Sequence, residues 1–97
     1  MKKIVWTQSA ARDLRRIFDY IAADSEVCAR AMIDEIFESI ERLPFFPKSG
    51  RVVPEVRNEH IREIIIGSYR LIYDIKNEAI RILVVIHGAK ILKTRRL

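Results

Sequence analysis

The chain contains few of the residues on which disulfide frameworks and metal sites depend. Its 97 residues include one cysteine, Cys28, and two histidines. A single cysteine excludes an intramolecular disulfide, and so few potential ligands, far apart in the sequence, predict no metal site. We expect neither a metal nor an organic cofactor. The lone thiol also fits a reducing compartment, which predicts a cytoplasmic protein.

Glycine, proline and long apolar runs are also scarce. With three glycines and three prolines the chain is not rich in loops, and it lacks a glycine-rich phosphate loop. The longest uninterrupted aliphatic run, residues 82–86, has five residues, whereas a membrane span needs about 20. The basic N-terminus is interrupted by polar residues too early for a signal peptide. We therefore expect no membrane association.

The composition is that of a globular protein, but its charge is uneven. Apolar residues make up 49% and charged residues 32%, and the length fits one domain over residues 1–97. Residues 1–47 carry seven Lys/Arg and eight Asp/Glu, whereas residues 48–97 carry eleven and five, a net charge of +6. A basic C-terminal half favours an acidic or polyanionic partner, although a chance excess of arginine on a soluble surface gives the same pattern.

The N-terminal half has the periodicity of a strand followed by two amphipathic helices. Residues 2–6 predict a short strand, and Thr7 or Ser9 can cap a helix with an apolar stripe. A short link at residues 22–25 leads to a second helix, which we expect to end at Leu43 because Pro44 disfavours helical geometry before it. So short a link predicts an antiparallel helical hairpin.

The C-terminal half predicts strands. Residues 44–60 are punctuated by proline and glycine and read as irregular. Three β-rich runs follow at residues 61–66, 69–75 and 79–86, and the last is apolar enough to lie in the interior of a sheet. The predicted class is therefore α+β in the order β-α-α-β-β-β, with the hairpin packed on one face of a small, mainly antiparallel sheet. The other face or its rim is left for function.

Arginines on the predicted sheet are the first candidate site residues. Arg62 and Arg70 lie on adjacent strands, and an arginine among apolar neighbours is costly to bury without an anion. The anion is either a ligand phosphate or carboxylate, or a structural partner such as Glu63 or Asp74. Arg51, in a preceding turn, is either a further ligand contact or a solvated charge.

The end of the last strand and the segment after it carry the other candidates. His87 is either a structural residue or a general base beside Lys90. Residues 89–97 form a short basic tail, which is either a solvated end or a contact for a nucleic-acid backbone. Cleavage of RNA would need a base, cations for the phosphorane and an acid. The candidate catalytic set is Arg62, Arg70, His87 and Lys90, and the candidate anion-binding or target-binding set is Arg51, Arg62, Arg70, Lys90, Lys93, Arg95 and Arg96.

The order of these segments resembles the RelE/ParE superfamily, the toxins of type II toxin–antitoxin (plasmid stabilisation) systems. The resemblance covers about residues 4–92 and implies the β-α-α-β-β-β fold, cytosolic residence and neutralisation by a small antitoxin. Its specific motifs are Trp-Thr-Gln-Ser-Ala-Ala-Arg-Asp-Leu at 6–14, Tyr-Ile at 20–21, Leu-Pro at 43–44, Val-Pro-Glu at 53–55, Ile-Arg-Glu-Ile-Ile-Ile-Gly-Ser-Tyr-Arg-Leu-Ile-Tyr at 61–73 and Val-Ile-His-Gly-Ala-Lys at 85–90.

The resemblance leaves two targets open. The RelE branch cleaves mRNA on the ribosome, and Arg70 matches its strand arginine while Arg62 falls close to its strand lysines. Lys90, however, stands where that branch usually has arginine, and residues 94–97 lack its tyrosine. The ParE branch is associated with poisoning DNA gyrase. We favour a ParE-like toxin that binds gyrase, with an mRNA endonuclease as the alternative and a non-toxic member that retains antitoxin binding as a third reading.

The expected partners follow from charge as well as from the resemblance. A basic half-chain and the grooves of a helical hairpin suit an acidic, partly disordered antitoxin segment that folds on binding and can add a strand to an open sheet edge. Operator DNA would be reached only through the antitoxin. A toxin homodimer within the complex is compatible with the sequence, but nothing in the sequence requires it.

Overall fold

The order of helices and strands is the predicted one, with one short strand added. The computed structural model describes residues 2–97, and none of its helices is both long and apolar enough to cross a bilayer. The elements are β1 (Lys3–Trp6), α1 (Gln8–Ala22), α2 (Glu26–Ile40), β2 (Arg51–Val52), β3 (Ile61–Ile66), β4 (Tyr69–Lys76), β5 (Ala79–His87) and the 3-10 helix η1 (Thr94–Arg96).

Both α-helices begin at a side-chain cap. The Thr7 hydroxyl oxygen accepts a hydrogen bond from the Ala10 amide at 3.1 Å, and the Ser25 hydroxyl oxygen accepts one from the Cys28 amide at 3.1 Å. The end of α2 differs from the prediction. The helix stops at Ile40, and the Leu43 amide donates to the Ile40 carbonyl in a tighter turn. That turn buries Leu43 completely.

The five strands within residues 2–97 form one mixed sheet in the order β1-β5-β4-β3-β2, and among these strands only the β1–β5 pair is parallel. The strand expected in the interior is β5, which lies between β1 and β4. The added strand is β2, two residues in a segment predicted to be irregular. It pairs with β3, so that Arg51 lies opposite Glu63 and Val52 opposite Arg62. A strand this short leaves no alternation that sequence patterns can detect.

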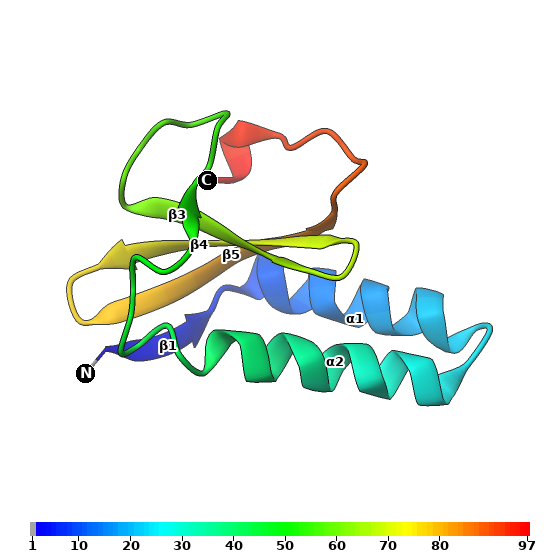
Figure 1. Ribbon diagram of the computed structural model, residues 1–97. Helices are drawn as coiled ribbons and strands as arrows, with labels where there is room; N and C mark the ends of the chain where they lie inside the picture. Colours follow the sequence, from blue (N-terminus) through cyan, green and yellow to red (C-terminus); the bar gives the residue numbers. More distant parts are fainter. Residues whose placement is uncertain (1) are drawn as a thin grey trace.

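The helical hairpin packs on one face of the sheet (Figure 1). Apolar residues of α1 and α2 meet alternate residues of the strands, among them Tyr69 and Tyr73. The fully or nearly buried members of this core are Ala10, Ile17, Ile36, Ile40, Leu43, Ile66, Tyr69, Leu71, Tyr73, Ile80, Ile82 and Val85.

The opposite face is not open, as the sequence suggested, but carries a second, smaller core. The segment between β2 and β3 and the chain after β5 both cross above this face in Figure 1. Val53, Ile72, Leu83, Val84 and Leu92 are buried there. The basic tail is therefore anchored to the sheet by an apolar side chain in its middle, rather than lying free in solvent.

One irregularity in β5 decides which residues share a face. Ile72 of β4 lies opposite Val84 and Tyr73 lies opposite Ile82, so Leu83 is an extra residue in β5, a β-bulge. Leu83 and Val84 both pack in the second core. The alternation of β5 is thereby shifted by one residue beyond the bulge.

Candidate functional site

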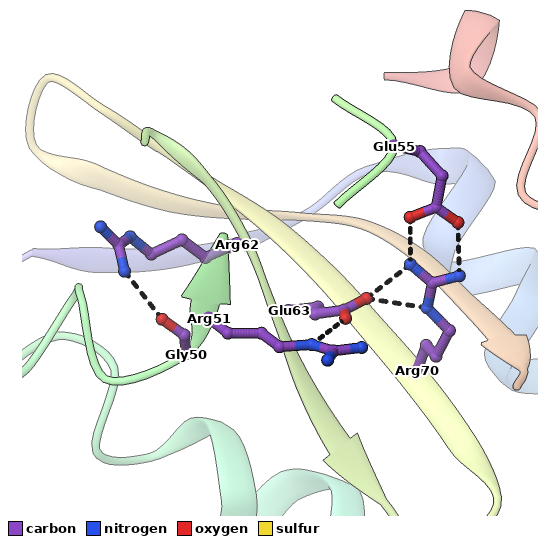
Figure 2. Close-up of polar contacts among 6 residues, drawn as sticks. All are labelled: Gly50, Arg51, Glu55, Arg62, Glu63 and Arg70. Atoms are coloured by element: carbon purple, nitrogen blue, oxygen red, sulfur yellow. Dashed lines mark hydrogen bonds and ion pairs between the residues drawn. The ribbon is translucent and has the colours of Figure 1, made fainter. Parts of the chain in front are cut away.

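The β2 end of the sheet carries three arginines, Arg51, Arg62 and Arg70, and two glutamates, Glu55 and Glu63, and we call this region the arginine network (Figure 2). The Arg70 guanidinium makes two hydrogen bonds with the Glu55 carboxylate, at 2.8 and 2.9 Å, and its Nε donates to Glu63 at 2.7 Å. Arg51 donates to the other oxygen of Glu63. The Glu63 side chain is fully buried, and the Arg70 side chain is 11% exposed. Two carboxylates thus neutralise the two arginines that contact them.

These contacts stabilise the charged forms of the groups involved. The hydrogen bonds from Arg70 lower the pKa of the Glu55 carboxyl from 4.5 to about 2. The same contact with Glu55 raises the pKa of Arg70 above its usual value. Arg70 is therefore a permanent cation whose hydrogen-bonding fork is already occupied by carboxylate oxygens.

Arg62 belongs to the same region but contacts carbonyl groups rather than carboxylates. Its guanidinium donates to the Gly50 carbonyl at 2.9 Å and to the Glu59 carbonyl at 2.8 Å. Beside it, the Tyr73 hydroxyl donates to the Pro47 carbonyl at 2.6 Å and accepts from the Gly50 amide at 3.1 Å. These bonds fasten the segment before β2 to the sheet.

Of the two acids proposed from sequence as structural partners for the strand arginines, Glu63 binds Arg70, whereas Asp74 pairs with Arg81.

The second group of candidate cations lies around a groove of about 800 Å³ between α1, the end of β5 and the basic tail. One wall is a face of α1 that includes Ile17 and Tyr20, and the facing residues come from β5 and the tail. The charged residues and the histidine that line the groove are Asp13, Arg16, His87, Lys90, Lys93 and Arg96. Arg95 is exposed in η1 and is not among them.

Asp13 is the buried anchor of this groove. Its carboxylate accepts a hydrogen bond from the Val85 amide at 3.0 Å and one from Arg96 at 2.8 Å. Its side chain is 5% exposed, and the Arg16 guanidinium lies 3.7 Å from its other oxygen. Arg96 also bonds the Ser9 hydroxyl. Asp13 therefore ties the tail and β5 to α1.

His87 lies at the groove with its ring edge against Tyr69, at a centroid distance of 5.5 Å. The His87 Nδ1 accepts a hydrogen bond from the Ala89 amide at 3.1 Å. Because Nδ1 accepts, a neutral ring carries its proton on Nε2, and the remaining nitrogen is a donor. The histidine therefore presents a donor rather than a proton acceptor in this geometry.

The candidate residues thus form two groups rather than one. Arg70 projects on the face of the second core, whereas His87 beyond the bulge is on the helix face with Tyr69. Arg51, Arg62 and Arg70 lie in the network, and His87, Lys90, Lys93 and Arg96 line the groove. Residues 2–97 contain no cluster of three or more His, Cys, Asp or Glu side chains suited to a metal ion.

Sequence reasoning missed three residues in these two places. Asp13 falls between Ala10 and Ile17 at helical spacing, so an acid on the buried stripe of α1 was a usable signal. Arg16 is exposed on α1, and its place beside the groove depends on where the tail runs. Glu55 lies in an irregular segment, and no local pattern connects it with Arg70.

Comparison with known proteins assigns the family. The family described as "ParE toxin of type II toxin-antitoxin system, parDE" matches residues 4–92. The chain belongs to this family. The assignment to type II toxin–antitoxin toxins made from sequence motifs is therefore confirmed, and the protein is a toxin of such a system.

Relatives from both branches of the superfamily are similar to this toxin. Toxin RelE2 of Caulobacter vibrioides is 26% identical over 91 residues, covering 94% of this chain and all of the relative. The chromosomal ParDE system of P. aeruginosa superimposes with a TM-score of 0.74 at 23% identity, over 90% of this chain and 96% of that one. The toxin–antitoxin complex RelBE2 of Mycobacterium tuberculosis gives a TM-score of 0.58 at 24% identity, over 89% and 96%. The two structures confirm the α+β fold.

Proposed function

We propose that this toxin acts by binding DNA gyrase, as a ParE-like toxin, and not by cleaving RNA. The observation that carries the proposal is the pairing of Arg70. Its guanidinium is held by Glu55 and Glu63, so a phosphate could reach it only by displacing carboxylates that already satisfy its charge. Stabilisation of a phosphorane requires cations aimed at the developing charge and free to meet it.

The arrangement of His87 supports the same conclusion. A general base must accept a proton from the attacking hydroxyl within hydrogen-bond reach. The Nδ1 of His87 is engaged by the Ala89 amide, and the ring lies on the opposite sheet face from Arg70. The four residues considered for catalysis, Arg62, Arg70, His87 and Lys90, therefore lack the convergence that in-line cleavage needs.

We further propose that an acidic antitoxin holds the toxin inactive in the cytoplasm. The two similar solved structures are described as a ParDE system and a RelBE2 toxin–antitoxin complex. The groove beside α1 supplies lysine and arginine side chains to such a partner. Contact with operator DNA through the antitoxin, and a toxin homodimer, stay predictions from the sequence.

Purified toxin tests the choice of target directly. In a supercoiling assay we expect inhibition of gyrase and accumulation of cleaved gyrase–DNA complexes. In a ribosome-dependent cleavage assay we expect intact mRNA. His87→Ala sharpens the comparison, since loss of a general base costs about 100-fold or more in a nuclease, whereas gyrase inhibition should change by less than about twofold.

The alternative is a RelE-type endonuclease, which the similarity to Toxin RelE2 favours. Truncated mRNA with unaffected gyrase, and a large loss of that cleavage in His87→Ala, would establish the alternative and reject our proposal. Activity in neither assay, with no growth defect on induction, would leave the non-toxic reading.

A further inference from the structure

The turn after α2 exposes two neighbouring phenylalanines, which we call the phenylalanine patch. Phe45 and Phe46 are each 65% exposed, whereas Leu43, at the start of the same turn, is fully buried. Neither phenylalanine belongs to the two cores of the fold. A single apolar side chain on a protein surface needs no explanation, but adjacent large ones form a patch of the kind that marks an interaction site.

The backbone that carries the patch is held in place at both ends. The amides of Phe45 and Phe46 donate to the Arg42 carbonyl, at 3.0 and 2.9 Å. The Tyr73 hydroxyl donates to the Pro47 carbonyl at 2.6 Å and so ties the turn to β4. The two phenyl rings are therefore presented on a preorganised backbone, which reduces the conformational entropy lost when a partner binds.

A pocket of about 580 Å³ lies beside the patch, with Phe46, Pro47 and Ile75 as its apolar lining. Lys2 also lines it and donates to the Asn77 carbonyl in the turn before β5. The groove described above is instead lined by residues 84–87 at the end of β5. The pocket and the groove therefore lie at opposite ends of this strand (Figure 1).

The charges around the pocket are positive. Lys2, Lys48 and His60 line it, and no Asp or Glu among residues 2–97 does so. Lys48 pairs with Glu59 at 2.9 Å, but both side chains are more than half exposed. Such a pair contributes little to stability, so Lys48 can change partner at small cost. Charge complementarity thus favours a ligand that places a carboxylate next to an apolar group.

We propose that gyrase binds the toxin here, by placing an apolar side chain in the pocket and a neighbouring carboxylate against Lys2 and Lys48. The proposal rests on the proposed function and assigns that target a contact surface. An apolar anchor seated in a pocket among charged pairs is the usual composition of an interface hot spot. Because the groove lies at the other end of β5, this contact leaves the groove free for the antitoxin.

Other occupants fit the patch less well. A single-stranded nucleic acid stacks its bases on aromatic rings but also needs a row of cations along its backbone. Of the two lysines that line the pocket within the described residues, Lys48 is already paired with Glu59. A symmetric contact with a second copy of the chain would bring the same lysines of both copies together, which is repulsive.

Binding of the full-length toxin to immobilised gyrase holoenzyme tests the proposal, with inhibition of supercoiling as a second readout. Phe45→Ser/Phe46→Ser should weaken both by about tenfold or more, as loss of a hot spot does. The matched control is Val27→Ser/Ile65→Ser, which removes two apolar side chains that are 79% and 57% exposed and lie outside the pocket. The control should change either readout by less than about twofold.

Charge reversal tests the electrostatic part. Lys2→Glu/Lys48→Glu should weaken binding to gyrase by about fivefold at low salt, and by less as salt rises. Arg12→Glu/Arg57→Glu makes the same change in net charge at exposed positions outside the pocket and should have less than about a twofold effect. Thermal unfolding of every variant checks that the fold is retained.

Hydrogen exchange of the wild-type toxin locates the contact without any substitution. On binding of gyrase we expect slower exchange at the amides of Phe45, Phe46, Lys48 and Ser49. Protection confined to residues 84–93, with exchange in the turn unchanged, would place gyrase at the groove and overturn the proposal.

The remaining outcomes separate the contact surface from the choice of target. Wild-type toxin that neither binds nor inhibits gyrase rejects the target and the contact together. Equal inhibition by wild type and Phe45→Ser/Phe46→Ser rejects the contact alone. The contact is also overturned if this variant inhibits gyrase normally but loses binding to a labelled oligothymidylate, self-association in sedimentation, or complex formation with the co-expressed antitoxin.

Discussion

The arginine network and the groove contain similar numbers of cations but differ in what surrounds them. In the network, Glu55 and Glu63 neutralise Arg51 and Arg70, and Arg62 is bound by carbonyl groups. In the groove, the buried Asp13 faces both Arg16 and Arg96, while Lys90 and Lys93 line the surface. A surplus of positive charge in the sequence therefore locates a binding surface only after internal pairing is taken into account.

Each region depends on one buried acid, Glu63 in the network and Asp13 beside the groove. Glu63 is shared by two arginines and holds strands β2, β3 and β4 together. Asp13 holds α1, β5 and the tail. We expect substitutions in the network to change stability more than function, and substitutions on the groove rim to do the reverse.

The largest expected effect is that of Glu63→Ala. Removing the fully buried carboxylate leaves Arg70 and Arg51 short of a partner and opens a cavity, which should cost about 3 to 5 kcal/mol of unfolding free energy. Urea denaturation measures it. Glu59→Ala removes an exposed ion pair with Lys48 and should have little effect. Similar stabilities for the two variants would show that the network is not structural.

A smaller effect is expected for Asp13→Ala. The variant leaves the Val85 amide and Arg96 without their acceptor, at a cost of about 2 kcal/mol. It should also release the tail, so amide exchange in residues 90–96 should accelerate. Asp19→Ala, at an exposed position on the same helix, is the control, and equal exchange rates in the two variants would contradict the anchoring role of Asp13.

The smallest expected effect on the free energy of unfolding is that of Glu55→Gln, and this effect should depend on pH. Arg70 lowers the pKa of Glu55 from 4.5 to about 2, so the folded state is favoured above pH 4.5, and this contribution is lost as the pH falls toward 2. Glu55 is 38% exposed, so the difference at pH 7 should stay below about 1 kcal/mol.

Unfolding curves of wild type and Glu55→Gln should therefore converge as the pH is lowered from 4.5 to about 2. Glu78→Gln, at an exposed turn position, should run parallel to wild type over that range. A constant gap between wild type and Glu55→Gln would mean that the carboxylate charge contributes nothing to the pairing.

The fold could be predicted because its signals are local and repeated. Helical spacing in α1 and α2, the caps at Thr7 and Ser25 and the two-residue turn of Gly67 and Ser68 between β3 and β4 each act within a few residues. The pairing of Arg70 with Glu63 was foreseen as one alternative, since the two lie on adjacent strands.

The arrangement of the site could not be predicted, because it depends on contacts between distant segments. Glu55 reaches Arg70 from an irregular loop, and Arg96 reaches Asp13 from the far end of the chain. The face of the sheet on which each residue of β5 lies could not be predicted either. Residues 82–86 are all aliphatic, so the sequence gives no alternation from which to assign faces.

The extra residue at Leu83 has a consequence for how this family can change. With strict alternation through β5, His87 would fall on the same side of the sheet as Arg70, and the bulge puts the two on opposite sides. Deleting Leu83 would remove the bulge and leave His87 opposite Tyr69, whereas regular pairing that kept every residue of β5 would move the imidazole to the face of the guanidinium. The register of the last strand against β4 thus decides whether one set of side chains is divided between two surfaces or gathered on one.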